Sequence, residues 1–415
     1  MKYLNWVGAI VCTSIAVAGT ITGLLYYTSL PGLIIDPPQP AAAVTVGIEP
    51  ATAAQPSDLT MLESLIDARF GTPSITIRDI STGVTVFDYQ GERGLVAAST
   101  AKVFTAAAAL LRLDPDSVLT TTVVADGPTT AVVKASGDVS LNNTAIADLA
   151  AQIRKNLPEV STVLVDTTAW EAPQFLESWD RRDIDGGFIT PMQPIMLNGG
   201  RIGGETGNLA RSHQPARDVA KALADELGVQ TFGETSAPAA KDAKVIASIT
   251  SPTLYERLEV MLQDSDNVLA EAIGREVNAQ DPAATTLSTL EPILDGNQVL
   301  LFDNSGLSLE NRISAKALDA IIYHAATDTP ELRPLLQLLP VAGGSGTLES
   351  RYGDATSRGW VRAKTGTLDA VASLAGTIQA RSGRVYSFAM ICNDTDVVSA
   401  RAGMDELATV VYENG

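Results

Sequence analysis

An unbroken apolar segment near the amino terminus limits where in this chain a globular fold can begin. After Lys2, an almost uncharged run extends from about Leu4 to Tyr27, which is long enough to cross ~30 Å of hydrocarbon as a helix. A cleaved signal peptide normally has an apolar core of only ~7–15 residues, although Ala16-Val17-Ala18 offers a small-residue cleavage pattern. We therefore expect residues 1–27 to form an uncleaved membrane helix, with a cleaved signal as the alternative.

The charges around this segment predict on which side of the membrane the rest of the chain lies. Lys2 precedes the run and the next cation is Arg69, so the positive-inside bias places the remainder outside the cytoplasm. Six prolines among alanines follow between residues 28 and 56, a composition typical of extended, poorly packed chain. We interpret residues 28–56 as a spacer that lifts the folded part off the bilayer.

Charge and composition narrow the classes of function open to the folded part. The chain has 29 Lys and Arg against 48 Asp and Glu, a formal net charge of -19. This disfavours nucleic acid as a partner, because its phosphates need neutralising cations. The cysteines, Cys12 and Cys392, and the histidines, His213 and His324, cannot supply a disulfide framework or a recognisable zinc ligand set. Neither histidine stands beside a nucleophile motif of a Ser-His-Asp hydrolase, and we expect no metal or other cofactor.

Hydrophobic periodicity predicts an α+β fold that is interrupted by a second unit. Alternating residues indicate a β-hairpin over 74–79 and 84–89. Between about 120 and 235 the pattern changes to short strands with polar turns and two helices, and the Ala-, Pro- and Ser-rich stretch 236–242 resembles its exit. We expect one domain formed by residues 57–119 and 236–415, interrupted by an inserted α+β unit at 120–235. The predicted helices are 59–70, 99–113, 145–155, 216–227, 252–263, 268–277 and 400–412, and the final strands are 371–379 and 384–392.

The segment Ser99-Thr100-Ala101-Lys102 is the first candidate for chemistry. A hydroxyl and an amine three residues apart at the start of a helix project from one face within contact distance. Serine is a weak nucleophile until a base removes its proton, and Lys102 can be that base only if burial or a second cation, such as Lys364, lowers its pKa. The helix amino terminus also stabilises negative charge that develops near Ser99. By itself the pattern is more typical of an exposed helix start.

Two further motifs supply complementary groups. Ser265-Asp266-Asn267, in a turn between two predicted helices, offers a hydroxyl for proton relay and an amide that can bind a peptide backbone. Ser140-Leu141-Asn142 is a rival for this role but lacks the full triplet, and a helix-capping turn is the structural alternative. Lys364-Thr365-Gly366-Thr367 precedes the final pair of strands. There Gly366 allows a substrate backbone to approach and Lys364 can attract a terminal carboxylate, with a plain turn as the alternative.

In this order the three motifs resemble the signature of penicillin-binding proteins and class A β-lactamases. The long span from Ser99 to Ser265 is similar to that of class C low-molecular-mass penicillin-binding proteins, D-alanyl-D-alanine carboxypeptidases or endopeptidases whose transpeptidase-like domain is interrupted after the catalytic helix. The resemblance covers about residues 57–412 and implies a β-lactamase-like domain with an antiparallel sheet and flanking helices. The insert is shorter than in the largest members, which implies a reduced or missing third domain. Further segments that agree are Ser136 to Asp138, Ser251-Pro252, Asp303 to Ser308, Asn311 to Ala315, Pro340 to Gly343 and Gly346 to Leu348.

This resemblance implies acyl transfer on peptidoglycan stem peptides that end in D-Ala-D-Ala. Ser99 attacks the carbonyl of the penultimate D-alanine, the terminal D-alanine leaves, and water or an amine resolves the ester. Backbone N–H groups of Ser99 and Thr367 form the oxyanion hole, and β-lactams acylate Ser99 as inhibitors. The implied catalytic residues are Ser99, Lys102, Ser265 and Lys364, and the implied substrate-binding residues are Asn267, Thr365, Gly366 and Thr367.

Other functions share these motifs. A β-lactamase or esterase uses the same residues on another acyl group, and a catalytically idle wall-binding scaffold keeps the fold without the chemistry. Carboxypeptidase and endopeptidase reactions pass through the same acyl-enzyme, so the motifs do not separate them. For Asp303 to Leu307 we favour an ordinary turn over a catalytic role, and for Trp170 and Trp179 we favour core packing over contact with substrate.

Overall fold

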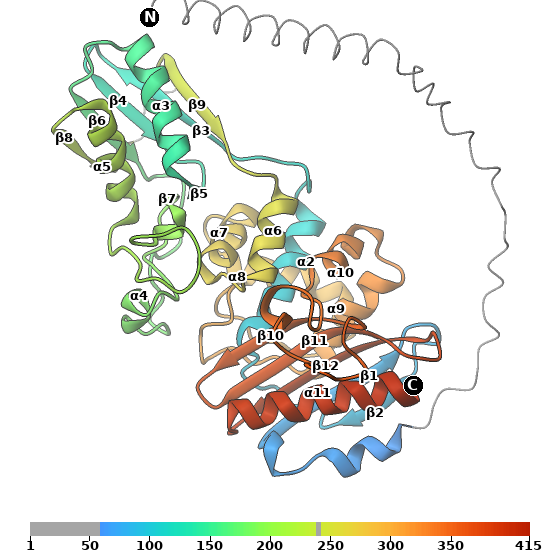
Figure 1. Cartoon of the computed structure of the whole chain (residues 1–415). Coiled ribbons are helices and arrows are strands. Elements are labelled where there is room, and N and C mark those ends of the chain that lie inside the picture. Colours follow the sequence, from blue (N-terminus) through green and yellow to red (C-terminus); the bar gives the residue numbers. More distant parts are fainter. Residues whose placement is uncertain (1–58, 238–241) are drawn as a thin grey trace, which may run out of the picture. The chain divides into compact units, whose positions relative to one another are not determined.

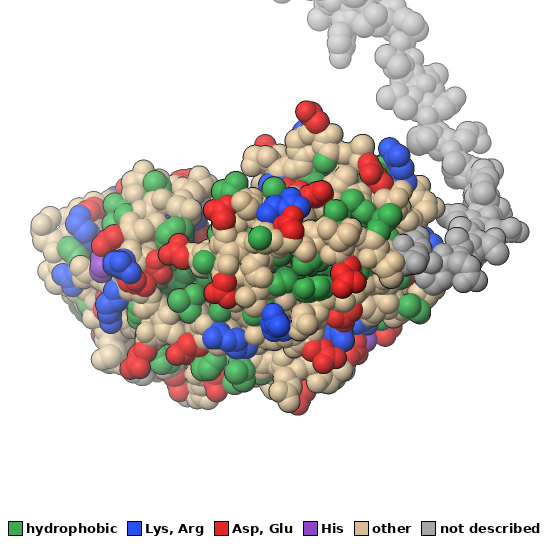
Figure 2. Space-filling model, turned by 90° about the horizontal axis from the view of Figure 1, so that it is seen from below, with side chains coloured by type: hydrophobic (Ala, Val, Ile, Leu, Met, Phe, Trp, Pro, Cys, Tyr) green, Lys and Arg blue, Asp and Glu red, His purple; other side chains and the backbone are tan. Residues whose placement is uncertain are grey.

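The computed structural model describes residues 59–237 and 242–415. The predicted membrane helix at 1–27, the spacer at 28–56 and Cys12 lie outside these ranges. Within them, no helix combines the length and apolar character needed to cross a bilayer. Cys392 is buried, and burial raises the pKa of its thiol to about 12. Acidic side chains are distributed among basic ones over the face of the molecule that Figure 2 shows.

A five-stranded antiparallel sheet with the strand order β10-β11-β12-β1-β2 forms the base of the fold (Figure 1). Strand β12 pairs with β1 from Thr72↔Asn393 to Asp79↔Tyr386, so the first and last strands of the folded chain lie side by side. Strand β10 lies at an edge of the sheet. The predicted hairpin and final strands are thereby confirmed. The strands are β1 Thr72–Asp79, β2 Thr85–Tyr89, β10 Val361–Leu368, β11 Val371–Gln379 and β12 Val385–Asn393.

One face of this sheet is covered by the carboxyl-terminal helix α11 (Val397–Asn414) (Figure 1). Two short 3₁₀ helices, Thr60–Leu65 and Ala68–Phe70, pack against α11. The prediction of one continuous helix over 59–70 is therefore wrong. The break occurs at Ile66, which has extended backbone angles, and Asp67 then accepts a hydrogen bond from the backbone N–H of Arg69. A local cap thus begins a new turn where periodicity indicated continuity.

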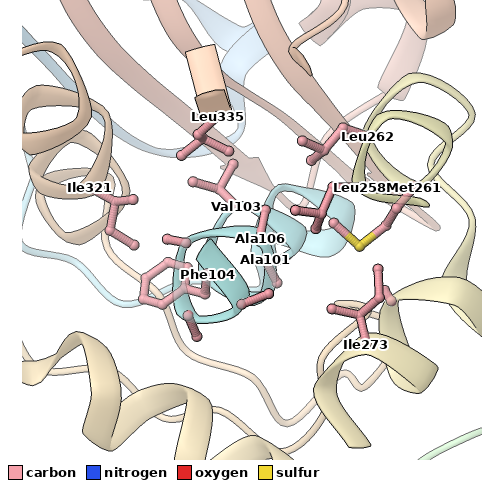
Figure 3. Close-up of a cluster of buried hydrophobic side chains, with 14 of the residues drawn as sticks. Ala101, Val103, Phe104, Ala106, Leu258, Met261, Leu262, Ile273, Ile321 and Leu335 are labelled. Atoms are coloured by element: carbon pink, nitrogen blue, oxygen red, sulfur yellow. The ribbon is translucent and has the colours of Figure 1, made fainter. Parts of the chain in front are cut away.

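The other face is covered by helices that surround α2 (Lys102–Arg112). All α2 residues from Lys102 to Leu110 are buried, and Figure 3 shows side chains from neighbouring helices, including Leu258, Ile273 and Leu335, converging on it. Each large apolar side chain buried here contributes roughly 1.5–3 kcal/mol, so α2 is held rigidly. The surrounding helices are α6 Leu254–Gln263, α7 Asn267–Val277, α8 Pro282–Leu290, α9 Ala315–Ala326 and α10 Arg333–Leu338.

Between α2 and α6 the chain forms a second, mixed sheet with the strand order β8-β6-β4-β3-β9. Strand β3 pairs antiparallel with β4 and β9, whereas β4, β6 and β8 are parallel. Helices α3 and α5 pack on each other and on this sheet. A smaller parallel pair of strands, β5 and β7, belongs to the same insertion. The elements are β3 Thr120–Asp126, β4 Thr130–Lys134, β5 Asp138–Leu141, α3 Asn143–Asn156, β6 Thr162–Asp166, α4 Arg182–Asp185, β7 Ile195–Leu197, α5 Pro215–Leu227, β8 Thr231–Thr235 and β9 Val245–Thr250.

The predicted boundary of the insert at residue 235 is one strand too early. Strand β9 lies beyond that residue and pairs with β3, with Thr120 opposite Thr250. The composition of 236–242 suggested an exit, but the chain returns to the insert's sheet after it. Part of the insert packs against the helical layer, because Trp179 and Met196 are buried in the same hydrophobic cluster as α2. This agrees with the core packing that we favoured for Trp179. This part of the insert is therefore buried in the core of the helical layer, whereas the insert's mixed sheet and helices α3 and α5 have a core of their own.

Candidate active site

Ser99 lies in a 3₁₀ turn (Ala98–Ala101) that leads directly into α2. Its predecessor Ala98 has a φ of 48°, in the left-handed region that alanine rarely adopts. Gly306 packs against this backbone so closely that a Cβ there would stand 1.9 Å from the Ala98 carbonyl oxygen. Such conformations cost about 1–3 kcal/mol and persist only where the surroundings fix them. Ser99 is thus held half-buried at the amino end of a rigid helix.

Lys102 is fully buried, and its amine contacts the Ser99 hydroxyl as the sequence predicted. Its Nζ lies 3.0 Å from Ser99 Oγ and donates to Asn267 Oδ1 at 2.6 Å and to the Ser305 carbonyl at 2.7 Å. Burial lowers the pKa of Lys102 to about 8, although the nearby carboxylates, Asp303 first, partly oppose this shift. At neutral pH the Lys102 amine is therefore uncharged in a fraction of the molecules, and there it can accept a proton.

Lys364 and Ser265 form a second amine–hydroxyl pair in the same site. Lys364 Nζ donates to Ser265 Oγ at 2.8 Å and to the Thr365 carbonyl at 2.7 Å. Burial, and next the charge of Lys102, hold the pKa of Lys364 well below its usual value. The rival Ser140 lies on β5, where its hydroxyl donates to Asp138 at 2.6 Å. The structure thus brings Ser265, and not Ser140, to Ser99 and the two lysines.

The loop from Asp303 to Ser308 positions the carbonyl that Lys102 contacts. Asp303 is buried and accepts hydrogen bonds from Trp179 Nε1 and from the backbone N–H of Gly306, both at 2.9 Å. Glu271 Oε1 accepts the backbone N–H groups of Asn304 and Ser305 at 2.8 and 2.9 Å. This segment is the turn that we favoured, and its Ser305 carbonyl also accepts a hydrogen bond from the Lys102 amine in the site.

Asp266 anchors the turn between α6 and α7, and sequence analysis missed its partners. Its carboxylate caps α7 through the Leu269 N–H at 2.9 Å and pairs with Arg201 at 2.5 Å and Arg211 at 3.3 Å. Burial by itself raises the pKa of Asp266, but Arg211, Arg201 and these hydrogen bonds outweigh it and lower the pKa to about 2. Both arginines come from the connection between β7 and α5, about 60 residues earlier, so spacing along the chain carries no signal of the contact.

Replacing Asp266 with alanine is expected to destabilise the protein by about 3–5 kcal/mol, because it leaves the buried guanidinium of Arg211 and the partly buried one of Arg201 without their carboxylate partner. Because the pKa of Asp266 is lower in the folded state than in the unfolded chain, its charged carboxylate adds about 2 kcal/mol to the free energy of unfolding. This contribution is fully present above about pH 4 and is lost as pH falls through about 2. Urea unfolding of parent and variant at pH 7 and at pH 3 measures both effects. Asp281→Ala is the control, since Asp281 also precedes a helix but makes no side-chain capping bond; equal loss in both variants would contradict the ion-pair explanation.

Thr365, Gly366 and Thr367 lie on the edge strand β10, where alternate side chains point to opposite sides. Thr365 Oγ1 donates to Thr347 Oγ1 at 2.7 Å, and Thr367 is exposed and accepts a hydrogen bond from Arg401. A Cβ on Gly366 would meet Ser373 Oγ at 2.1 Å, the Ala97 carbonyl at 2.7 Å and the Ser99 backbone nitrogen at 3.0 Å. The glycine therefore admits the protein's own Ser99 turn, a contact that we did not predict, and its role in the approach of a substrate backbone stays a prediction.

A Gly366→Ala variant is expected to lose stability by about 1–3 kcal/mol through overpacking and to acylate more slowly, because its methyl group pushes against the Ser99 turn. Chemical unfolding and the rate of reaction with a fluorescent penicillin measure the two effects. Gly353→Ala is the matched control, since no atom lies within 4 Å of a Cβ at that exposed position. Parent-like acylation by Gly366→Ala would show that the contact with the Ser99 turn is unimportant.

An open cleft of about 1470 Å³ joins these residues. Ser99, Ser265, Asn267, Thr365 and Thr367 line it, together with arginines from the insert and from α11. Its volume exceeds that of a typical small-molecule pocket, which suits a peptide. Among the described residues, His, Cys, Asp and Glu form no group of three or more that could hold a metal ion.

The sequence matches the family model of the D-Ala-D-Ala carboxypeptidase 3 (S13) family over residues 63–210 and 203–413. This chain belongs to that family. It is 38% identical to carboxypeptidase DacB of Mycolicibacterium smegmatis, over 92% of this chain and 90% of the relative, and 40% identical to carboxypeptidase Rv3627c of Mycobacterium tuberculosis, over 91% and 89%. The predicted family and enzyme class, a serine-type D-alanyl-D-alanine carboxypeptidase, are confirmed.

The fold of this S13 carboxypeptidase is similar to solved structures. Penicillin binding protein 4 (dacB) from Haemophilus influenzae superposes with a TM-score of 0.72 at 20% identity, over 85% of this chain and 99% of the other. The Bdellovibrio bacteriovorus endopeptidase Bd3459 gives 0.57 at 14% identity, over 82% and 92%. These matches confirm the predicted α+β fold, and the mixed sheet of the insert is a feature that was not predicted.

Proposed function

We propose that this S13 carboxypeptidase removes the terminal D-alanine from peptidoglycan stem peptides through an acyl-enzyme on Ser99. The observation that carries the proposal is the 3.0 Å contact between Ser99 Oγ and a fully buried lysine amine. A second amine–hydroxyl pair, Lys364 and Ser265, lines the same site. Nucleophile, base and proton relay are thereby all within reach of a carbonyl bound in the cleft.

In the acylation step, neutral Lys102 accepts the proton of Ser99 as Oγ attacks the carbonyl of the penultimate D-alanine. The backbone N–H groups of Ser99 and Thr367 stabilise the oxyanion, a contribution of roughly 3–4 kcal/mol per donor. Ser265 and Lys364 pass a proton to the departing amine of the terminal D-alanine as the amide bond breaks. Water then hydrolyses the ester and regenerates Ser99.

We further propose that Asn267 and Thr365 position the substrate, because their contacts hold both side chains at the cleft wall. Asn267 holds Lys102 through Oδ1 and donates through Nδ2 to the Phe188 carbonyl at 3.0 Å, which fixes the orientation of its amide at the cleft wall. Thr365 donates a hydrogen bond to Thr347, and both threonines line the cleft. A β-lactam presents a strained amide to the same groups, so we expect it to acylate Ser99. A relative's structure, that of Haemophilus influenzae penicillin binding protein 4, has been solved with a β-lactam.

The proposal is tested by incubating the full-length chain, in detergent, with a pentapeptide that ends in D-Ala-D-Ala. Chromatography measures the D-alanine that is released. We expect stoichiometric D-alanine and tetrapeptide. A cross-linked muropeptide dimer tested in parallel separates the two reactions, since its conversion to monomers requires endopeptidase activity. Absence of D-alanine from the pentapeptide would refute the carboxypeptidase assignment, and cleavage of the dimer alone would replace it with an endopeptidase.

We also propose that the enzyme works outside the cytoplasm, tethered by residues 1–27. The apolar run after Lys2 and the proline-rich stretch behind it support this placement, as does the extracytoplasmic location of cross-linked peptidoglycan. Fractionation of cells that express the full chain and a variant starting at residue 57 tests it. Recovery of the full chain in the soluble cytoplasmic fraction would contradict the proposal.

A further inference from the structure

The cleft wall carries five arginines, and one of them differs from the others because no carboxylate of the described chain pairs with it. Among the described residues that line the cleft, Arg201 and Arg211 pair with Asp266, Arg182 with Asp180, and Arg351 with Asp405. No carboxylate of the described chain lies within ion-pair distance of Arg401. Its guanidinium Nη2 instead donates to the neutral hydroxyl of Thr367.

The surroundings of Arg401 have an excess of positive charge. Arg401 lies on α11, four residues before Asp405, but that carboxylate is held by Arg351 at 2.5 Å. Burial first, and then the charge of Arg351, lower the pKa of Arg401, while Asp405 partly opposes the shift. A guanidinium remains charged under all physiological conditions. An anion that binds here would therefore relieve repulsion between two cations and meet a planar donor group.

The position of Arg401 matches the end of a substrate bound for attack by Ser99. Thr367 provides an oxyanion N–H in the proposed mechanism, and its side-chain oxygen contacts Arg401. The carboxylate of the departing D-alanine is one residue beyond the scissile carbonyl, which places it near the side chains of Thr365 and Thr367 on β10. Both threonines and Arg401 line the cleft.

Lys364 is poorly suited to the carboxylate-binding role that its sequence motif suggested. It is fully buried, and its amine already donates to Ser265 and to the Thr365 carbonyl. Its pKa is well below the usual value, so its positive charge is reduced. The cation available to an anionic group in this part of the cleft is Arg401.

We propose that Arg401 binds the carboxylate that neighbours the scissile bond, and so selects leaving groups that carry this anion. This inference rests on the proposed acyl-enzyme mechanism and adds a specificity residue from α11 to the three motifs. It concerns the leaving group alone, because the acyl-enzyme that remains on Ser99 no longer contains the carboxylate.

A pair of thioester substrates isolates this contact. Both carry the same acyl-D-alanyl group, and the leaving group is mercaptoacetate in one and mercaptoacetamide in the other. Release of thiol gives kcat/KM, which reports acylation. For Arg401→Gln we expect kcat/KM to fall roughly 10- to 100-fold on the mercaptoacetate thioester, as for a lost charge-assisted hydrogen bond. On the mercaptoacetamide thioester we expect kcat/KM to change less than about threefold, because its leaving group carries no carboxylate. Arg401→Lys keeps the charge but not the fork of donors, so we expect partial recovery on the mercaptoacetate ester.

Two controls separate this role from others. Arg362→Gln makes the same change of charge at an exposed position on β10, and it should leave both rates as in the parent. If Arg401 merely holds Thr367 in place, Arg401→Gln slows both thioesters equally, and the inference is wrong. If the parent releases thiol from neither ester, the acyl-enzyme mechanism itself fails and this inference falls with it.

Discussion

Ser99→Ala is expected to abolish covalent labelling by a fluorescent penicillin and to reduce kcat/KM for D-alanine release by roughly 10⁴- to 10⁶-fold, the range seen when a catalytic serine is removed. The expected loss is large because Ser99 Oγ is the hydroxyl that the buried amine of Lys102 contacts at 3.0 Å. Intact-mass spectrometry of the labelled chains gives the stoichiometry, which should be one adduct on the parent and none on the variant.

Ser140→Ala provides the comparison for this experiment, because Ser140 belongs to the rival motif and contacts Asp138 on β5. It should label like the parent, and both variants should keep the parent's melting temperature within a few degrees. Equal labelling of Ser99→Ala and the parent would show that another residue is the nucleophile. A parent that takes no adduct supports the idle scaffold, and rapid turnover of the drug supports a β-lactamase.

Lys102→Met is expected to slow acylation by about 10²- to 10⁴-fold, the usual contribution of a general base. The pKa of Lys102, lowered to about 8 by burial, also predicts the pH dependence of the parent. Because only the neutral amine accepts the proton of Ser99, the acylation rate should rise as pH increases toward 8 and then level off. Stopped-flow measurement of penicillin acylation between pH 5.5 and 9.5 tests both statements.

The variant should lose this rise with pH near 8. The remaining lysine of the site, Lys364, should titrate at a higher pH than in the parent, since the charge of Lys102 helps to depress the pKa of Lys364. Lys155→Met, at an exposed position on α3, controls for the loss of one positive charge. A Lys102→Met enzyme with the parent's rate and pH profile would exclude Lys102 as the base.

Lys102, Ser265 and Lys364 in the site of the reacting serine could be predicted from sequence because they occur in short motifs whose chemistry is recognisable. The first motif, with Ser99 and Lys102, lies at a helix start, Ser265 lies in a turn, and Lys364 lies on a strand. The fold brings these three elements together. Hydrophobic periodicity likewise predicted α6 and α7 beside α2, because burial on one face imposes a repeat that a single sequence reveals. Helices α8, α9 and α10 of the same layer were not predicted.

Other site residues lie outside any motif, and only the tertiary structure identifies them. Arg201 and Arg211 reach Asp266 from a long connection in the insert, and Arg401 reaches Thr367 from the last helix. The packing of Gly366 against the Ser99 turn was missed for a related reason, because the atoms that a Cβ would meet belong to Ser373, Ala97 and Ser99 rather than to its own strand. Contacts between distant segments leave no periodic pattern in one sequence.

The paired strands β3 and β9 also affect the order in which the chain can fold. Leu119 and Ser251 exchange hydrogen bonds at the point where the insert joins the helices, with Ser251 N donating to the Leu119 carbonyl at 2.9 Å. Helices α2 and α6 must meet across the roughly 140 residues between Arg112 and Leu254. If the insert's sheet forms first, it shortens that loop to about ten residues and lowers the entropic cost of closing it by roughly 2–3 kcal/mol. The insert would then act as an internal clamp, so that mutations which weaken the β3–β9 pairing slow the assembly of the active-site helices far away.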